Sequence, residues 1–127
     1  MSHFTTVKTK MVSKEHLKKA LRDLGMAFQE GRLSIRGFGG QTTEVEIKIP
    51  TANPGYDLGF RTKGDAYELV ADWWGIKDIR QDDLLRQLNQ RYAYHVAKEQ
   101  LEQQDFTLVE EEVQQDQTIH LTVRRMV

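Results

Sequence analysis

The sequence contains no cysteine, only two prolines and no long hydrophobic run. The absence of cysteine excludes disulfides, thiolate nucleophiles and metal or iron–sulfur sites held by thiolates. No stretch approaches the roughly 20 apolar residues that a membrane-spanning helix needs, and the amino terminus lacks a signal-peptide pattern. We therefore expect a soluble, intracellular protein without a membrane span.

An excess of charge of either sign is missing as well. The 127 residues carry 18 basic and 19 acidic side chains, which gives a net charge of −1. Domains that bind nucleic acid without sequence preference use a positive field against the phosphates, so binding of this kind is disfavoured. A chain of this length is close to the usual size of one domain and needs no metal or partner to fold. We expect a single domain over residues 1–127.

Two segments have the apolar spacing of helices. A first helix is predicted between Ser13, which is a favourable N-cap residue, and Gly25, which is placed to end it. A second and longer helix is predicted from about Asp82 to Gln103. Its outer, solvent-exposed face is expected to carry Tyr94.

Alternation of apolar and polar residues predicts seven strands around these helices. They are expected near residues 3–9, 28–35, 43–49, 56–61, 67–74, 106–113 and 118–125, with residues 114–117 as the last loop. This order indicates an α+β fold with an antiparallel sheet and two helices packed on one face. Each helix has one strand before it and two after it, so two β-α-β-β halves that share the sheet are a further expectation.

The segment Gly37-Phe38-Gly39-Gly40 is a glycine-rich loop. A phosphate-binding loop follows a strand and opens a helix, so that free amides face the anion, whereas an alternating strand follows here. A hairpin or a mobile loop is therefore favoured over a phosphate site. A small-ligand pocket between this loop and the sheet stays open as an alternative.

The four histidines show no spacing that would place metal ligands on one helical face. His3 and His120 would approach each other only if the terminal strands paired. We predict no catalytic residue, no metal site and no cofactor.

Adjacent tryptophans, Trp73 and Trp74, are the most informative feature of the chain. Consecutive strand residues point to opposite faces, so a sheet covered on one side cannot bury both rings. Trp73 is expected in the core. Trp74 is expected either under a loop or terminus, or exposed as an aromatic contact residue on a polar sheet face. That face would be rimmed by Arg61, Glu68 and Asp72.

Charge is unevenly distributed along the chain. Residues 1–23 carry six basic and two acidic side chains, whereas residues 99–116 carry seven acidic and no basic ones. Two solvated faces are the simplest interpretation. Attraction within the fold, steering of a charged partner and pairing between copies remain open.

Four segments in combination resemble a known family. They are residues 1–9, 56–60, 67–75 and 91–94, which read MSHFTTVKT, YDLGF, YELVADWWG and RYAY. Over nearly its whole length the chain is similar to the hypothetical chloroplast reading frame thirty-five family, a domain of unknown function in cyanobacteria and some algal plastids. The resemblance implies a photosynthetic cell and a location in the cytoplasm or the plastid stroma. It implies no activity, ligand or catalytic residue.

Three functional hypotheses follow from these observations. The first is a non-catalytic accessory protein that binds an unidentified protein partner through the sheet face around Trp74. The second is a small-ligand module or an enzyme with a pocket near Gly37 to Gly40. The third is RNA binding by the basic face of the first helix, with Tyr94 or Trp74 stacking on unpaired bases. Strand order and oligomeric state stay undetermined at this stage.

Overall fold

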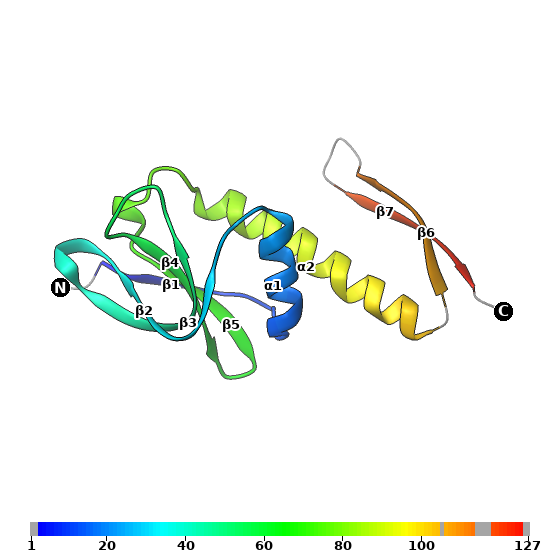
Figure 1. The fold of residues 1–127 in the computed structure, drawn as a ribbon, viewed down its shortest axis with the longest axis horizontal. Helices are drawn as coiled ribbons and strands as arrows, with labels where there is room; N and C mark the ends of the chain where they lie inside the picture. The colour runs from blue at the N-terminus through cyan, green and yellow to red at the C-terminus, as the bar shows by residue number, and fades with distance from the viewer. Residues whose placement is uncertain (1–2, 105, 114–117, 126–127) are drawn as a thin grey trace.

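A computed structural model describes residues 3–104, 106–113 and 118–125 (Figure 1). Every predicted helix and strand is present, but the loop expected at residues 114–117 lies outside the described residues. The strands are β1 (Thr5–Lys8), β2 (Gln29–Arg36), β3 (Thr42–Pro50), β4 (Asp57–Lys63), β5 (Ala66–Ala71), β6 (Phe106–Val113) and β7 (Ile119–Arg125). The helices are α1 (Lys14–Asp23) and α2 (Gln81–Gln103), and two short 3₁₀ turns lie at Phe38–Gly40 and Trp73–Gly75.

The strands form two separate antiparallel sheets. Five of them pair in the order β1-β5-β4-β3-β2, and β6 pairs with β7. This confirms the α+β class, with an antiparallel sheet and two helices. The two predicted β-α-β-β halves do not share that sheet. Because α2 has 23 residues, it is about 34 Å long. It carries the chain past the first sheet before β6 begins, as Figure 1 shows.

Helix α1 begins where the capping pattern predicted. The Ser13 side chain accepts a hydrogen bond from the His16 backbone N–H, which satisfies one of the free amides of the first turn. Leu17, Ala20 and Leu21 are completely buried. The apolar stripe read from the sequence is therefore the core-facing side of this helix.

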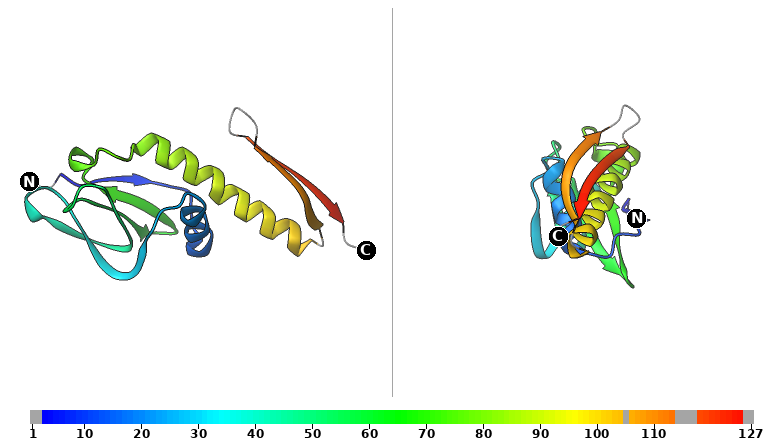
Figure 2. Two further views of the ribbon diagram at one scale, coloured as in Figure 1. Left: turned by 45° about the horizontal axis from the view of Figure 1, so that its top comes forward. Right: turned by 90° about the vertical axis from the view of Figure 1, so that its right-hand side faces the viewer.

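Both helices bury their apolar stripes in one core with the sheet. Leu17 and Leu21 of α1 meet Leu88 of α2, together with Phe60 of β4 and Leu69 of β5. The helices also contact each other, and Figure 2 shows them in two further views. The main core thus lies between the helix pair and one face of the five-stranded sheet.

The opposite face of the sheet is covered too, which corrects the expectation of a polar face exposed to water. Val70 alternates with the core residues of β5 and packs there with Ile35 and Val45 of the β2–β3 hairpin. Gly59 permits this close approach, because a Cβ atom at residue 59 would lie 2.4 Å from Val45 Cγ1. A second, smaller apolar cluster therefore occupies the face that the alternation left to solvent.

Candidate functional site

The two tryptophans do not lie in a strand. β5 ends at Ala71, and Trp73–Gly75 form a single 3₁₀ turn, so the predicted strand is wrong beyond residue 71. Trp73 is partly buried and packs against the main core, whereas Trp74 is 63% exposed. The two rings are separated as predicted, but a turn rather than strand alternation separates them.

Asp72 holds this turn from beneath. Its side chain is 1% exposed, and its Oδ1 accepts a hydrogen bond from the Trp74 backbone N–H at 3.2 Å. Its Oδ2 accepts another from the Phe38 backbone N–H at 2.8 Å. A carboxylate that accepts two backbone amides makes strong, charge-assisted hydrogen bonds. One buried side chain therefore positions the backbone of two aromatic residues, Phe38 and Trp74, that are far apart in the sequence.

The aromatic rings above Asp72 form a cluster that we name the aromatic corner, comprising His3, Phe38, Tyr56 and Trp74. The Phe38 and Trp74 rings meet edge to face with centroids 5.4 Å apart, and Tyr56 lies 6.3 Å from Trp74. His3 lies 4.7 Å from Phe38. Phe38 is 44% exposed, so two exposed apolar rings, Phe38 and Trp74, are neighbours. Together they present an apolar patch to the solvent.

Close backbone packing makes the aromatic corner rigid. A Cβ atom at Gly75 would lie 2.1 Å from Tyr56 Cε1, so the tyrosine ring rests directly on the Gly75 backbone. The Asn53 side chain donates a hydrogen bond to the Gly75 carbonyl oxygen at 2.7 Å. The turn that carries Trp74 is thus fastened to the loop between β3 and β4.

The loop Gly37–Gly40 belongs to the same corner, but three of its four backbone amides donate hydrogen bonds within the fold. Gly37 N–H donates to Gln41 O, Phe38 N–H donates to Asp72, and Gly40 N–H donates to Gly37 O. A phosphate cradle needs free amides that point at the anion. The loop geometry therefore gives the small-ligand hypothesis no support, and the loop instead presents Phe38.

The predicted polar rim is largely internal. Arg61 Nε donates to Glu68 Oε1 at 2.8 Å, and Arg61 Nη1 donates to Thr43 Oγ1 at 3.0 Å. Glu68 and Asp72 are buried, and Arg61 is partly buried. This corrects the expectation that these three side chains border an exposed contact face, because two of them have almost no surface to offer. A cavity of about 350 Å³ lies beside Arg61, and its lining does not include the Gly37–Gly40 loop.

Tyr94 is also buried, so its predicted place on the outer face of α2 is wrong. The β6–β7 hairpin packs back on α2, and Tyr94 borders a small space together with Ile119 and Leu121 of β7. Burial raises the pKa of the Tyr94 hydroxyl, and a hydrogen bond with Glu111 raises it further. The apolar periodicity of α2 does not indicate that Tyr94 is covered, because the covering hairpin is formed by residues that follow the helix in the sequence.

Acidic and basic side chains of the two helices contact each other. We name this cluster the helix seam, and it comprises His16, Asp23, Arg91, His95 and Glu99. His16 of α1 pairs with Glu99 of α2, while Asp23 at the end of α1 pairs with Arg91 at 2.8 Å and with His95 at 2.6 Å. Burial raises the pKa of Asp23, but the hydrogen bonds from Arg91 and His95 lower it by more, so its net pKa is lowered. The uneven charge along the chain is therefore offset in part by contacts between acidic and basic side chains within the fold.

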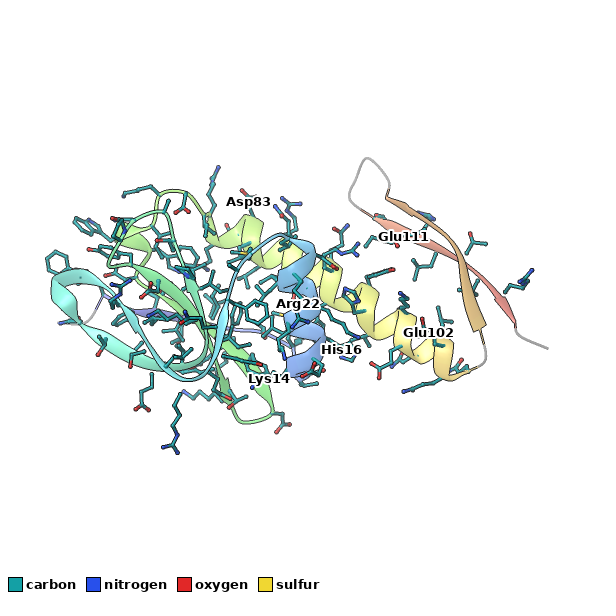
Figure 3. The ribbon with its side chains drawn as sticks, in the orientation of Figure 1. Lys14, His16, Arg22, Asp83, Glu102 and Glu111 are labelled. Carbon is teal, nitrogen blue, oxygen red and sulfur yellow. The ribbon has the colours of Figure 1, made fainter. Side chains whose placement is uncertain are left out.

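The basic face of α1 is partly neutralised. Lys14 and Lys18 both lie within ion-pair distance of Glu30 at the start of β2. Lys14 is labelled on α1 in Figure 3. Arg22 lies over the Phe28 ring. These contacts reduce the positive charge that the RNA-binding hypothesis requires.

Metal-binding clusters and membrane-spanning helices are both absent from the described residues. These residues include no group of three or more histidine, aspartate or glutamate side chains placed to hold a metal ion. β1 pairs with β5 and β7 pairs with β6, so terminal-strand pairing does not bring His3 and His120 together. Within the same ranges, neither helix has the length and apolar character needed to cross a bilayer.

The fold and the corner define a small α+β domain with a rigid, exposed aromatic patch. Residues 20–122 match the family described as protein of unknown function (DUF1257). The chain is 37% identical over 127 residues to the uncharacterized protein ycf35 of Cyanophora paradoxa, with 98% of each chain covered. It is 34% identical over 131 residues to the uncharacterized protein ycf35 of Guillardia theta, again with 98% of each covered.

A third relative is the uncharacterized protein ycf35 of Pyropia yezoensis, with 33% identity over 131 residues and 98% of each chain covered. The chain therefore belongs to the ycf35 (DUF1257) family, which confirms the resemblance read from the sequence. No solved structure matches it.

Proposed function

We propose that this protein is a non-catalytic accessory protein of photosynthetic cells that binds a protein partner through the aromatic corner. The observation that carries the proposal is the exposed pair Phe38 and Trp74, held in place by the buried carboxylate of Asp72. The organisms of the three relatives support the cellular setting. The cytoplasm or the plastid stroma is the proposed location.

Exposure of this kind favours a contact surface for an energetic reason. An indole that stays 63% exposed leaves apolar area in water, and covering that area with a partner is worth roughly 25 cal/mol per Å². A ring whose backbone is already fixed loses little conformational entropy when it binds. Aromatic residues with these properties are the usual centres of protein interfaces.

The proposed surface differs from the one suggested by strand alternation. Glu68 and Asp72 cannot touch a partner because they are buried, so the contact area shifts from the sheet face to Phe38 and Trp74. The Lys77 ammonium lies 6.0 Å from the centre of the Trp74 ring and adds a positive charge at its border. Asp72 has the role of a positioning residue beneath this surface.

The proposal is tested with the full chain immobilised and exposed to a lysate of a photosynthetic cell. We compare the wild type with Trp74→Ala and Phe38→Ala, and use Val12→Ala as the matched control. Val12 is 60% exposed but lies near the other end of β5, where Met11 accepts a hydrogen bond from Tyr67. Proteins retained on each variant are quantified by mass spectrometry.

We expect the same protein to be lost from both aromatic variants and kept by the control. A photo-crosslinking residue at position 74 should attach to that protein, whereas the same residue at position 12 should not. Circular dichroism confirms that each variant is folded. If the aromatic variants retain the same proteins as the wild type, the corner is not the binding surface.

A further inference from the structure

The first observation is an open edge on the five-stranded sheet. β1 is the last strand in the sheet order and pairs with β5 on one side. The Thr9 N–H donates to Tyr67 O. Along β1 the next residues on the same side are Val7, opposite Leu69, and Thr5, opposite Ala71, so these residues point their backbone groups toward β5. Hydrogen-bonded and open pairs alternate in an antiparallel ladder, so the backbone groups of Thr6 and Lys8 face the open edge. They are free to pair with another strand.

The second observation is an apolar cavity beside this edge. A space of about 540 Å³ is bordered by Val7 of β1 and by Trp73, Ile76 and Ile79 of the segment that leads into α2. The buried Trp73 Nε1–H finds no acceptor in the part of the chain that the structure describes. A strand added to β1 would place alternate side chains over this cavity.

The charge around the edge is positive. Lys8 lies on β1 itself, and Arg80 borders the cavity. Arg80 Nε lies 4.0 Å from Asp83 Oδ2, but the Arg80 side chain is 87% exposed and can reach a partner. Lys77 lies nearby, over Trp74. An acidic strand is therefore the complement that this edge favours.

The chain itself contains such a strand, β6. Its sequence FTLVEEEV includes three consecutive glutamates. Among the described strands β6 pairs with β7 alone, so it too has an open edge. A two-stranded sheet is marginally stable by itself and gains from a third strand. The hairpin packs beside the carboxy-terminal half of α2, away from β1, so the two open edges are separated within one molecule (Figures 1 and 2).

We propose that β6 of a second copy pairs with β1, and that two-fold symmetry makes the exchange reciprocal. Each five-stranded sheet would then be extended by the hairpin of the other copy, in a symmetric dimer with two equivalent strand contacts. In this arrangement Lys8 of β1 and the glutamates of β6 lie on facing strands, so opposite charges meet between the copies. The inference is independent of the aromatic corner as a partner-binding surface.

The test measures the mass of the full chain in solution by sedimentation velocity over a range of concentrations. Thr6→Pro removes the backbone N–H that faces the open edge, and Thr6→Ala is the matched control because it keeps that N–H. We expect a dimer for the wild type and Thr6→Ala. For Thr6→Pro we expect the dissociation constant to rise at least about tenfold, with an unchanged circular dichroism spectrum.

Charge exchange supplies a second test that does not depend on proline. Arg80→Glu and a variant with Glu110→Lys and Glu112→Lys should each weaken the dimer, and an equimolar mixture of the two should restore it. A wild type that stays monomeric at every concentration would overturn the proposal. So would a folded Thr6→Pro variant that dimerises like the wild type, or a monomeric wild type that binds a different protein through Thr6.

Discussion

The aromatic corner and the helix seam both depend on carboxylates that accept hydrogen bonds, yet they differ in burial. Asp72 at the corner is 1% exposed and accepts two backbone amides, whereas the Asp23 side chain in the seam is 27% exposed and accepts from two side chains. Removing a buried acceptor leaves amides without a partner, which costs about 1–3 kcal/mol for each group. Exposed ion pairs contribute about 0–1 kcal/mol. The corner is therefore a rigid structure, and the seam is a weak and pH-sensitive link.

The largest effect is expected from Asp72→Ala. The Phe38 and Trp74 amides would lose their acceptor in a buried setting, so the free energy of unfolding should fall by about 3 kcal/mol. Urea unfolding measures the loss. Asp78→Ala is the control, because exposed Asp78 accepts one amide, from Ala52, and its removal should cost well under half as much. Equal losses in the two variants would show that burial does not distinguish these carboxylates.

Gly75→Ala should have the next largest effect. The new methyl group would overlap the Tyr56 ring, which must then move, at a cost of about 1–3 kcal/mol. In a Tyr56→Ala background the same substitution should cost almost nothing, because the obstructing ring is gone. Thermal unfolding of the four proteins in this cycle measures the difference. Additive effects would mean that the ring does not rest on the glycine backbone.

Asp23→Asn addresses the helix seam and should have a smaller effect. The folded-state pKa of Asp23 is lowered, so the stabilisation by the charged carboxylate is present above its ordinary pKa of 3.8 and is lost as the pH falls through the folded-state pKa. At neutral pH the variant should lose up to about 1 kcal/mol, because the ion pairs of Asp23 are only partly buried and water screens them. Its melting temperature should also depend less on pH between neutrality and strong acid.

Asp65→Asn, in the exposed turn between β4 and β5, is the control for the acid series. It should leave both the neutral stability and the pH dependence close to those of the wild type. If Asp23→Asn leaves the pH dependence of the melting temperature as it is in the wild type, the helix seam is not the source of the pH sensitivity.

The smallest effect on stability is expected from Trp74→Ala. Its ring is mostly exposed, so the free energy of unfolding should change by about 0.5 kcal/mol or less. Trp73→Ala removes a ring that packs against the main core and should cost about 2–4 kcal/mol. Guanidinium unfolding of both variants makes the comparison. A large loss from Trp74→Ala would indicate a structural role and weaken the proposed function.

Much of the fold was predictable because it depends on neighbours in the sequence. The N-cap at Ser13 and the burial of Leu17 and Leu21 follow from helical spacing, and the inward residues of β3 follow from alternation. The end of β5 was not predictable in this way. Alternation continues in the sequence to Trp74, but Asp72 accepts the Trp74 amide and draws the chain into a turn.

The candidate site was predictable only in part. Trp74 was recognised from its neighbour Trp73, but Phe38 was noted only within a glycine-rich loop, because nothing local connects residue 38 to residue 72. Tyr94 was placed on the wrong side because the cover from the β6–β7 hairpin arises from a later part of the chain. The one local signal for Phe38 is its place between two glycines, a position with little local reason to be apolar.

By itself the sequence determined the family, the element order and the apolar stripes, since each of these depends on residues that are close together in the chain. Only the tertiary structure decided that Asp72 lies beneath Phe38 and Trp74, and that the second helix carries β6 and β7 away from the main sheet. The reason is that hydrogen bonds and packing between distant segments depend on how the elements meet in space, and local periodicity contains no information about that meeting.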